Sequence, residues 1–211
     1  EFKTNNKFTV GFCGRFEIPK NPLKFVEIAN YSKANNSLKF IMIGNGSLYN
    51  LIKFKSKKIN NLEILKSQYN LKEFYKKIDL LIVPSIREPF GNVIIEAGIN
   101  MVPVIASNVD GIPEIIENHH NGLLINPKNK IDKSLYLKNL KLFPKFVVNP
   151  NTLDLNEPLE ISTHECYNSI LKIKDNKKFR EKYTYNMKEI IREKFSIESY
   201  INKTNEIYSH L

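Results

Sequence analysis

The chain has 211 residues, of which 42% are hydrophobic and 26% are charged, as in an ordinary globular domain with a buried core. It has only two cysteines, no apolar run of membrane-spanning length and no secretory signal. The sequence therefore predicts no disulfide framework, no cysteine-based metal site and no membrane span, and we expect a cytoplasmic setting. Because the first residue is Glu1 rather than Met, we expect a fragment or a processed product.

The formal net charge of +10 permits three interpretations. The first is a solvated, lysine-rich surface, because lysines are spread along the whole chain and are densest between residues 53 and 58. The second is attraction to an anionic membrane surface, at the inner face of a membrane, or to a lipid-linked acceptor. The third, a nucleic-acid partner, is the least favoured, because the sequence has no zinc-finger spacing, helix-turn-helix cue or aromatic RNA-binding motif.

Strands and helices alternate over the first 126 residues. Short apolar runs predict six strands, at residues 8–13, 38–43, 62–65, 80–83, 103–106 and 123–125. Helical spacing and capping residues predict the helices between them, from Pro22 to about Asn35, from an N-cap at Ser47 to Lys57, after an N-cap at Asn70, from Phe90, and over 112–117. This alternation indicates an α/β fold, a Rossmann-like doubly wound parallel sheet of about six strands with helices on both faces.

The pattern changes after Asn126. Prolines recur from residue 127 to residue 158, so residues 128–160 are predicted to form an irregular insertion with one short helix or strand. Helical spacing returns over 161–211, with boundaries near 174–176 and 194–196 and Ser196 as the N-cap of the last helix. We therefore expect one domain over 1–211, with its core at 8–126 and helices at its C-terminus.

Residues 79–98 form the most informative stretch. A buried strand is followed by a polar corner with Glu88, and then by a helix with its apolar residues on one face: Phe90, Val93, Ile94 and Ala97. In a parallel sheet, the N-terminus of such a helix offers free N–H groups to a phosphate. Glu96 can lean back toward it and bind hydroxyl groups. Two glutamates eight residues apart are ordinarily unrelated surface charges, but beside an anion site they suit a sugar nucleotide.

The sequence Glu88-Pro-Phe-Gly-x-x-x-x-Glu96-Ala resembles the Glu-x7-Glu signature of the retaining GT-B glycosyltransferases, especially glycosyltransferase family 4, which usually has Gly where Pro89 stands. The resemblance implies that Glu88 contacts the donor sugar and that Glu96 binds the ribose. It also implies donor binding by residues at the start of the helix, where N–H groups would hold the diphosphate: Phe90, Gly91, Asn92 and Val93.

Gly14 and Arg15 follow the first strand, and four residues separate Arg15 from Lys20. Family 4 proteins have the same Gly-Arg, four-residue gap and Lys at this place. The resemblance assigns Gly14 to donor binding, and it makes Arg15 and Lys20 catalytic cations that neutralise the leaving diphosphate. Two unrelated surface cations are the ordinary alternative in a basic protein. The resemblance further implies that the reaction needs no metal and no other cofactor.

Three further segments carry the resemblance. Lys66 and Ser67 follow the third strand, where family members contact the nucleobase. Residues 44–46, Gly-Asn-Gly, resemble the family's Gly-x-Gly turn. Residues 108–114 resemble its Gly-Gly-Ile-Pro-Glu loop, but Asp110 replaces the first Gly and lacks its backbone freedom, which bears on the loop geometry near the sugar. The resemblance covers residues 8–126 and the start of the last helix, whereas 128–160 does not match.

The resemblance implies the donor-binding, carboxyl-terminal half of a GT-B fold, with hexosyl-type transfer from a nucleotide diphosphate sugar to an acceptor hydroxyl in polysaccharide, glycolipid or glycan synthesis. In the family an amino-terminal half binds the acceptor, and nothing in this sequence supplies that half. We therefore expect weak nucleotide binding, no transfer by the chain alone, and exposed apolar residues on the last helix. A non-catalytic nucleotide-sugar-binding module that works with a partner chain, and a basic nucleic-acid-binding domain, are the alternatives.

Overall fold

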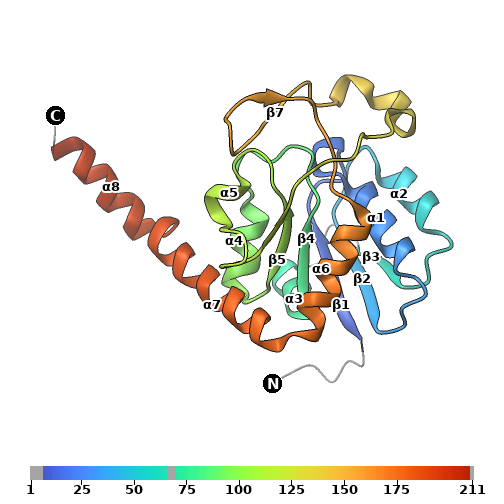
Figure 1. Cartoon of the computed structure of the whole chain (residues 1–211), viewed down its shortest axis with the longest axis horizontal. Helices are drawn as coiled ribbons and strands as arrows, with labels where there is room; N and C mark the ends of the chain where they lie inside the picture. Colours follow the sequence, from blue (N-terminus) through green and yellow to red (C-terminus); the bar gives the residue numbers. More distant parts are fainter. Residues whose placement is uncertain (1–6, 66–69, 210–211) are drawn as a thin grey trace.

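The computed structural model describes residues 7–65 and 70–209, together with their side chains except those of 137–141. Six parallel strands form one sheet in the order β3-β2-β1-β4-β5-β6, with β1 in its middle (Figure 1). The strands are β1 (Phe8–Cys13), β2 (Leu38–Ile43), β3 (Leu62–Leu65), β4 (Leu80–Val83), β5 (Val104–Ser107) and β6 (Leu123–Ile125). The predicted doubly wound sheet is confirmed, and five strands have the predicted bounds; the fifth lies one residue further along the chain.

Helices cover both faces of this sheet. The α-helices are α1 (Pro22–Tyr31), α2 (Tyr49–Ser56), α3 (Leu71–Lys77), α4 (Asn92–Ile99), α5 (Ile112–Ile115), α6 (Thr163–Asp175), α7 (Lys177–Lys194) and α8 (Ile197–Ser209). Two 3-10 helices, η1 (Ile18–Lys20) and η2 (Lys133–Leu142), lie before α1 and in the predicted insertion. α1, α2 and α6 pack against one face, and α3, α4, α5 and α7 against the other.

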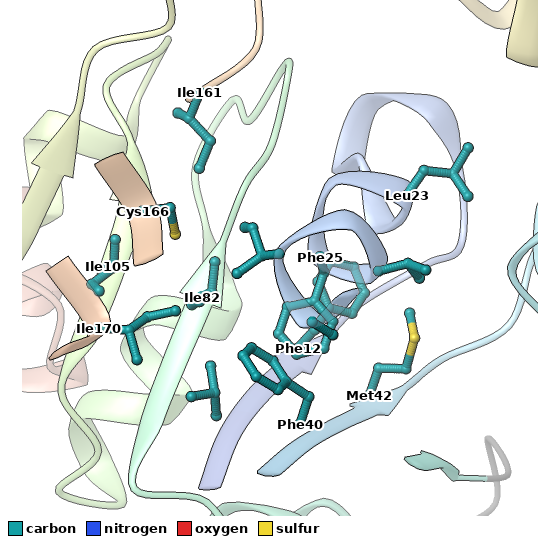
Figure 2. Close-up of a cluster of buried hydrophobic side chains, with 14 of the residues drawn as sticks. Phe12, Leu23, Phe25, Phe40, Met42, Ile82, Ile105, Ile161, Cys166 and Ile170 are labelled. Atoms are coloured by element: carbon teal, nitrogen blue, oxygen red, sulfur yellow. The ribbon is translucent and has the colours of Figure 1, made fainter. Parts of the chain in front are cut away.

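The apolar side chains of the strands contribute to two hydrophobic cores, one on each face of the sheet. Along β2, Phe40 and Met42 point to the face covered by α1 and α6, whereas Ile41 and Ile43 point to the opposite face. Figure 2 shows the first core, where Phe25 of α1 packs beside Phe40 and Phe12. Because successive side chains of a strand point to opposite faces, a strand covered on both sides must be apolar throughout, and this is why short unbroken apolar runs predicted the strands so closely.

Local capping signals were partly right. Asn70 accepts a hydrogen bond from the backbone N–H of Lys72, and Ser196 accepts one from the N–H of Ser199, so both predicted N-caps are confirmed. Ser47 is not an N-cap: Leu48 takes that position, while the N–H and hydroxyl of Ser47 both donate to the Glu17 carboxylate, at 2.7 and 2.6 Å. A partner distant in sequence has displaced the local cap.

Three predicted helix bounds also need correction. The first helix ends at Tyr31 rather than near residue 35, and the short fifth helix ends at Ile115 rather than at residue 117. The prediction that Phe90 lies in the fourth helix is wrong, because Gly91 is the N-cap and the helix begins at Asn92. Gly91 has φ +103°, a left-handed conformation that breaks the helix before it and that a side chain would strain.

The insertion at residues 128–160 has more structure than predicted. Besides η2 it contains an antiparallel ribbon of β7 (Val147–Val148) and β8 (Leu155–Asn156), which lies beyond the carboxyl ends of the central strands (Figure 1). The sequence predicted a single short helix or strand there, because two-residue strands leave no readable periodicity.

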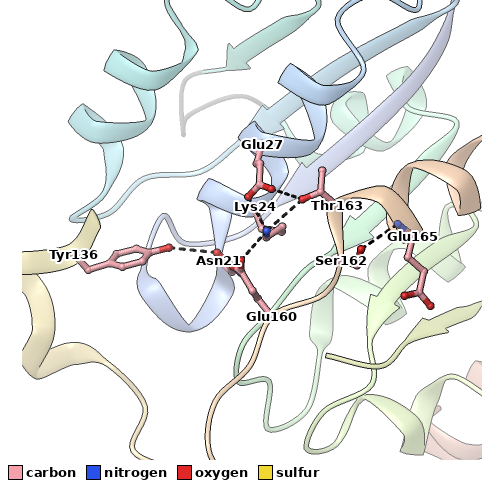
Figure 3. A network of polar contacts seen from close by, with 8 residues as sticks. All are labelled: Asn21, Lys24, Glu27, Tyr136, Glu160, Ser162, Thr163 and Glu165. Atoms are coloured by element: carbon pink, nitrogen blue, oxygen red, sulfur yellow. Dashed lines mark hydrogen bonds and ion pairs between the residues drawn. The ribbon is translucent and has the colours of Figure 1, made fainter. Parts of the chain in front are cut away.

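A buried polar network holds the insertion on α1 (Figure 3). The Lys24 side chain is only 3% exposed, and its ammonium lies 2.7 Å from a carboxylate oxygen of Glu160 and 2.6 Å from one of Glu27. Asn21 donates to the other oxygen of Glu160 and accepts a hydrogen bond from the Tyr136 hydroxyl. A buried ammonium requires such partners, so residues near both ends of the insertion are fixed to the start of α1.

The C-terminal helix α8 extends away from the body of the domain (Figure 1). None of its residues is buried, and Ile197, Tyr200 and Ile207 are 80%, 71% and 66% exposed. The expected exposed apolar residues on the last helix are therefore present. In the part of the chain that the structure describes, no helix combines the length and the apolar character that a membrane crossing requires.

The core assignment predicts the effect of two matched substitutions. Phe25→Ala removes a fully buried ring and should lower the free energy of unfolding by about 3–5 kcal/mol. Phe54→Ala removes a ring that is 66% exposed and should cost less than about 1 kcal/mol. Urea unfolding of the two variants measures both values, and equal losses would contradict the assignment of the core.

Candidate functional site

The strand order reverses between β1 and β4, and the loops that follow these strands lie together at the carboxyl edge of the sheet. The carbonyl of Pro19, in the loop after β1, accepts the backbone N–H groups of Ile86 and Arg87, in the loop after β4, at 2.8 and 3.1 Å. In an open α/β sheet, this reversal point is where a ligand-binding crevice forms. The two loops that carry the predicted catalytic residues are thus joined directly through their backbones.

Glu88 and Lys20 form an ion pair across this junction. The Lys20 ammonium lies 2.5 Å from Oε2 of Glu88, and the Ser85 hydroxyl donates to the same oxygen at 3.2 Å. Glu88 is 4% exposed, and a buried carboxylate must be paired to offset its lost hydration. The structure therefore brings together two of the three predicted catalytic residues. Arg15 follows β1 with an exposed side chain, which makes no ion pair or hydrogen bond within the described residues.

Asp110, which replaces a glycine of the resembling family, braces the same corner. Its carboxylate accepts the backbone N–H of Glu88 and that of Val148, each at 2.8 Å, and its own N–H donates to the Val148 carbonyl. Its φ of +44° is left-handed, a conformation that Asp tolerates better than most residues other than Gly. Sequence reasoning noted the replacement but missed this role. The only signal of this role in the sequence was a side chain able to form hydrogen bonds at a position where the family has glycine. Its hydrogen-bond partners become apparent only in the folded structure.

The corner packs tightly against the loop after β5. The Gly111 N–H donates to the Glu88 carbonyl, and a Cβ at Gly111 would lie 2.2 Å from the Pro89 carbonyl oxygen, so only glycine fits. No described side chain caps the first turn of α4, where Asn92 and Val93 stand. This helix terminus therefore keeps its amide groups for an anion.

Phe90 and Gly14 lie at the edges of this arrangement. Phe90 precedes α4, is 41% exposed and packs edge-on against Phe195, with the ring centroids 5.7 Å apart. Gly14 follows β1 and donates its N–H to the carbonyl of Ile43 on the neighbouring strand. The predicted nucleobase residues, Lys66 and Ser67, lie outside the described residues.

Glu96 is oriented by a tyrosine. The Tyr75 hydroxyl of α3 donates to Oε2 of Glu96 at 2.9 Å, which leaves the half-buried carboxylate with an oxygen for a second donor. Cys13, at the end of β1, lies in the same cluster: burial raises the pKa of its thiol to about 11, and the negative Glu96 adds to the rise. Burial also raises the pKa of Tyr75, so it stays a hydrogen-bond donor.

The site combines the cations Arg15 and Lys20 with the carboxylates of Glu88, Glu96 and Asp110. In residues 7–65 and 70–209, no group of three or more His, Cys, Asp or Glu side chains is placed to hold a metal ion. Arg15, Lys20 and the N-terminus of α4 contribute positive charge at this edge of the sheet.

Sequence comparison finds proteins similar to this chain. The profile described as "Glycosyl transferases group 1" matches residues 1–142. Over 127 residues the chain is 32% identical to the UDP-Gal:alpha-D-GlcNAc-diphosphoundecaprenol alpha-1,3-galactosyltransferase of Escherichia coli, and 29% identical to the capsular polysaccharide biosynthesis glycosyltransferase CapM of Staphylococcus aureus. Each match covers 57% of this chain and 33% of the relative, so the matched part spans about a third of these relatives.

Comparison with solved structures confirms the fold. The C-terminal domain of LpcC, a glycosyl transferase group 1 family protein from Francisella tularensis, has a TM-score of 0.66 at 19% identity, covering 90% of this chain and 87% of that domain. Alr3699/HepE from Anabaena, solved in complex with UDP-glucose, has a TM-score of 0.72 at 19% identity, covering 98% of this chain and 50% of that one. The Rossmann-like sheet with C-terminal helices is thus the fold of GT-B glycosyltransferase C-terminal domains.

The role of Asp110 gives a prediction about stability. Asp110→Gly still permits the left-handed backbone at this position but removes both side-chain hydrogen bonds. It should therefore lower the free energy of unfolding by about 1–3 kcal/mol. Hydrogen exchange should accelerate at the amides of Glu88 and Val148. Asp154→Ala, at an exposed carboxylate, is the control. Unchanged exchange at both amides in Asp110→Gly would contradict the bracing role.

The buried thiol gives a prediction about pH. The pKa of Cys13 is about 11 in the folded protein, against an ordinary value of 9.0. A raised folded pKa stabilises the protein fully below pH 9, and the contribution is lost as the pH rises toward 11. The unfolding free energy of the wild type should therefore fall relative to that of Cys13→Ser between pH 9 and pH 11. If the unfolding free energies of the two proteins, measured in urea, change in parallel with pH, the pKa of the Cys13 thiol is not raised by folding.

Proposed function

The chain belongs to the Glycosyl transferases group 1 family, and we propose that it is the donor-binding half of a retaining, hexosyl-type glycosyltransferase with GT-B architecture. The observation that carries the proposal is the junction of the two loops at the reversal point of the sheet. There the buried carboxylate of Glu88 pairs with Lys20, a few residues before the uncapped N-terminus of α4. This arrangement combines a carboxylate for sugar hydroxyls with positive charge for a diphosphate.

The proposed donor is a uridine diphosphate sugar. The diphosphate would bind at the N-terminus of α4, within reach of Arg15, and the ribose hydroxyls would donate to Glu96. The hydrogen bond from Tyr75 already holds one oxygen of Glu96, so the carboxylate needs little reorganisation to bind a ribose. The complex of HepE with UDP-glucose and the UDP-Gal specificity in the name of the E. coli relative support the choice of nucleotide.

We propose that catalysis depends on charge at the leaving group. The bond between the sugar's anomeric carbon and the diphosphate breaks, the acceptor oxygen bonds to that carbon on the same face, and the acceptor proton passes to the diphosphate. Lys20 and Arg15 would neutralise the charge that grows on the leaving group, so the reaction would need no metal. Glu88 would position the sugar through its hydroxyls, and neither Glu88 nor Glu96 would act as a nucleophile.

Transfer would require a second, acceptor-binding half. The matched part spans about a third of its curated relatives, and the exposed apolar residues of α8 would pack against the second half. Weak nucleotide binding and no transfer by this chain alone follow from the proposal. The names of the E. coli and S. aureus relatives support an acceptor in polysaccharide or glycolipid synthesis. The proposed setting is cytoplasmic or peripheral to a membrane.

Titration calorimetry with UDP, GDP and ADP, without added metal, tests the donor site. UDP should bind saturably, and Arg15→Ala and Glu96→Ala should each weaken it by about tenfold or more, because a charge-assisted hydrogen bond contributes about 1.5–3 kcal/mol. Glu88→Gln should bind UDP like the wild type, yet abolish transfer when the acceptor-binding half is present. Glu193→Gln, at an exposed carboxylate of α7, is the control. Full transfer by Glu88→Gln would overturn its role, and equal binding of all three nucleotides would overturn the choice of UDP.

A further inference from the structure

A pocket of about 410 Å³ lies between α1, the end of α2 and the insertion. Its volume is within the range of about 300–1,000 Å³ that is usual for small-molecule pockets. None of the described residues that are assigned to donor binding or catalysis lines it. The pocket is therefore separate from the candidate site, and the proposed function makes no use of it.

Apolar side chains from three segments converge on this pocket. Leu23 and Val26 line it from α1, Ile59 lines it just after α2, and all three are buried. Ile131 and Leu135 line it from the insertion, and Leu135 is 39% exposed. Scattered single apolar side chains at a surface need no explanation, but a group of them around one space marks a binding site. The body of an occupant would leave water here by packing on these side chains.

The buried polar network around Lys24 forms another part of the lining (Figure 3). The ammonium of Lys24 has three partners: Glu27, Glu160 and Thr163. Because an ammonium has three donors, Lys24 has none left for a ligand. Both carboxylate oxygens of Glu27 and both of Glu160 also accept a hydrogen bond or an ion pair. These groups are satisfied within the protein, so the charge of a ligand must be recognised elsewhere in the pocket.

The exposed part of the lining carries positive charge that the protein does not use. Lys55 and Lys58 line the pocket with exposed side chains, and neither ammonium forms an ion pair or a hydrogen bond within residues 7–65 and 70–209. Asp132 lines it from the insertion. Hydrogen bonds from Ser134 lower the pKa of Asp132, and the positive charge of Lys55 lowers it further. Two cations against one carboxylate leave one positive charge in excess.

This excess charge sets the kind of anion that fits. A carboxylate carries a single negative charge at neutral pH, whereas a phosphate monoester carries about −1.5 to −2. The C-terminal end of α2, where Lys55 stands, adds partial negative charge that disfavours a dianion. An occupant that matches the pocket therefore joins an apolar body to one carboxylate.

Asn21 links the pocket to the candidate site. It lines the pocket, is 1% exposed and directly follows Lys20. Its side chain donates to Glu160 and accepts a hydrogen bond from Tyr136, and both of these residues also line the pocket. Its φ of +49° is left-handed, so the backbone after Lys20 adopts a conformation that needs support from such contacts. A ligand that packs on Tyr136 would therefore also hold the backbone at Lys20.

We infer that this pocket is an effector site for a compact monocarboxylate with an apolar body, and that its occupant holds the backbone at Lys20 through Asn21. The apolar body lies on Leu23, Val26 and Leu135, and the carboxylate lies at Lys55 and Lys58. The inference goes beyond the proposed function and does not rest on it, because the pocket and the network are properties of the fold alone.

Titration calorimetry with trans-cinnamate, which joins one ring to one carboxylate, tests the class of ligand. Cinnamate should bind saturably to the wild type. Cinnamyl alcohol lacks the charge and should bind about fivefold or more weakly, and acetate lacks the ring and should bind about tenfold or more weakly. Equal affinity for the alcohol or for acetate would overturn the inference, as would the absence of saturable cinnamate binding. Tighter binding of phenyl phosphate than of cinnamate would overturn the choice of a monocarboxylate.

Two matched double variants test the place of binding. Lys58→Ala/Leu135→Ser removes one cation and one apolar contact from the pocket, and it should weaken cinnamate binding by about tenfold or more. Both residues are exposed, so this variant should fold. Lys53→Ala/Leu153→Ser changes an exposed lysine of α2 and an exposed leucine of the insertion that do not line the pocket, so it should bind cinnamate like the wild type. Equal affinities of the two variants would overturn the assignment of the pocket.

Hydrogen exchange tests the link to Lys20. Saturating cinnamate should slow exchange by about threefold or more at the backbone N–H of Asn21, which donates to the Ile18 carbonyl. Exchange at the N–H of Asn100, at the end of α4, is the control and should not change. Unchanged exchange at Asn21 with cinnamate bound would overturn the link.

Titration with UDP separates this pocket from the donor site. Saturating UDP should not displace cinnamate, and displacement would place the probe in the donor site and overturn the inference. Saturable binding of cinnamate without any binding of UDP would refute the proposed function alone, whereas binding of UDP without binding of cinnamate would refute the effector site alone.

Discussion

The candidate site depends on one ion pair, between the buried carboxylate of Glu88 and the ammonium of Lys20. Removing a carboxylate from water costs several kcal/mol unless a cation and hydrogen-bond donors replace its hydration. Lys20 and Ser85 supply these groups here. Lys20 and Glu88 lie far apart in the sequence. They can meet because β1 and β4 are adjacent at the point where the strand order reverses. The doubly wound topology therefore creates the site, and the apolar strands create the topology.

The sequence predicted what depends on nearby residues. Strands buried on both faces must be apolar throughout, so their runs could be located almost to the residue. The Asn70 cap was also predictable, because its partner lies two residues away. Ser47 failed for the opposite reason: Glu17, thirty residues earlier, takes both of its donors. Phe90 was placed in a helix because its spacing is helical, but the left-handed backbone of Gly91 starts that helix later.

The sequence offers candidate site residues but not their partners. The resemblance to a known family proposed a carboxylate, two cations and a helix terminus as candidates, whereas residue types and spacing alone would have left them as ordinary surface charges. That Lys20 pairs with Glu88, that Tyr75 orients Glu96, and that Asp110 holds Glu88 are properties of the folded chain alone. Asp110 is the clearest example. In the sequence it stands only as the loss of a glycine, whereas in the fold its carboxylate braces the Glu88 corner.

The insertion is tied to both members of the ion pair. Near its two ends, Tyr136 and Glu160 bind Asn21, which directly follows Lys20 (Figure 3). In its middle, Val148 shares Asp110 with the backbone of Glu88. A movement of the insertion would therefore strain hydrogen bonds on both sides of the pair at once. Because packed polar networks switch between discrete arrangements instead of deforming gradually, the position of the insertion is coupled to the geometry of the Glu88–Lys20 pair.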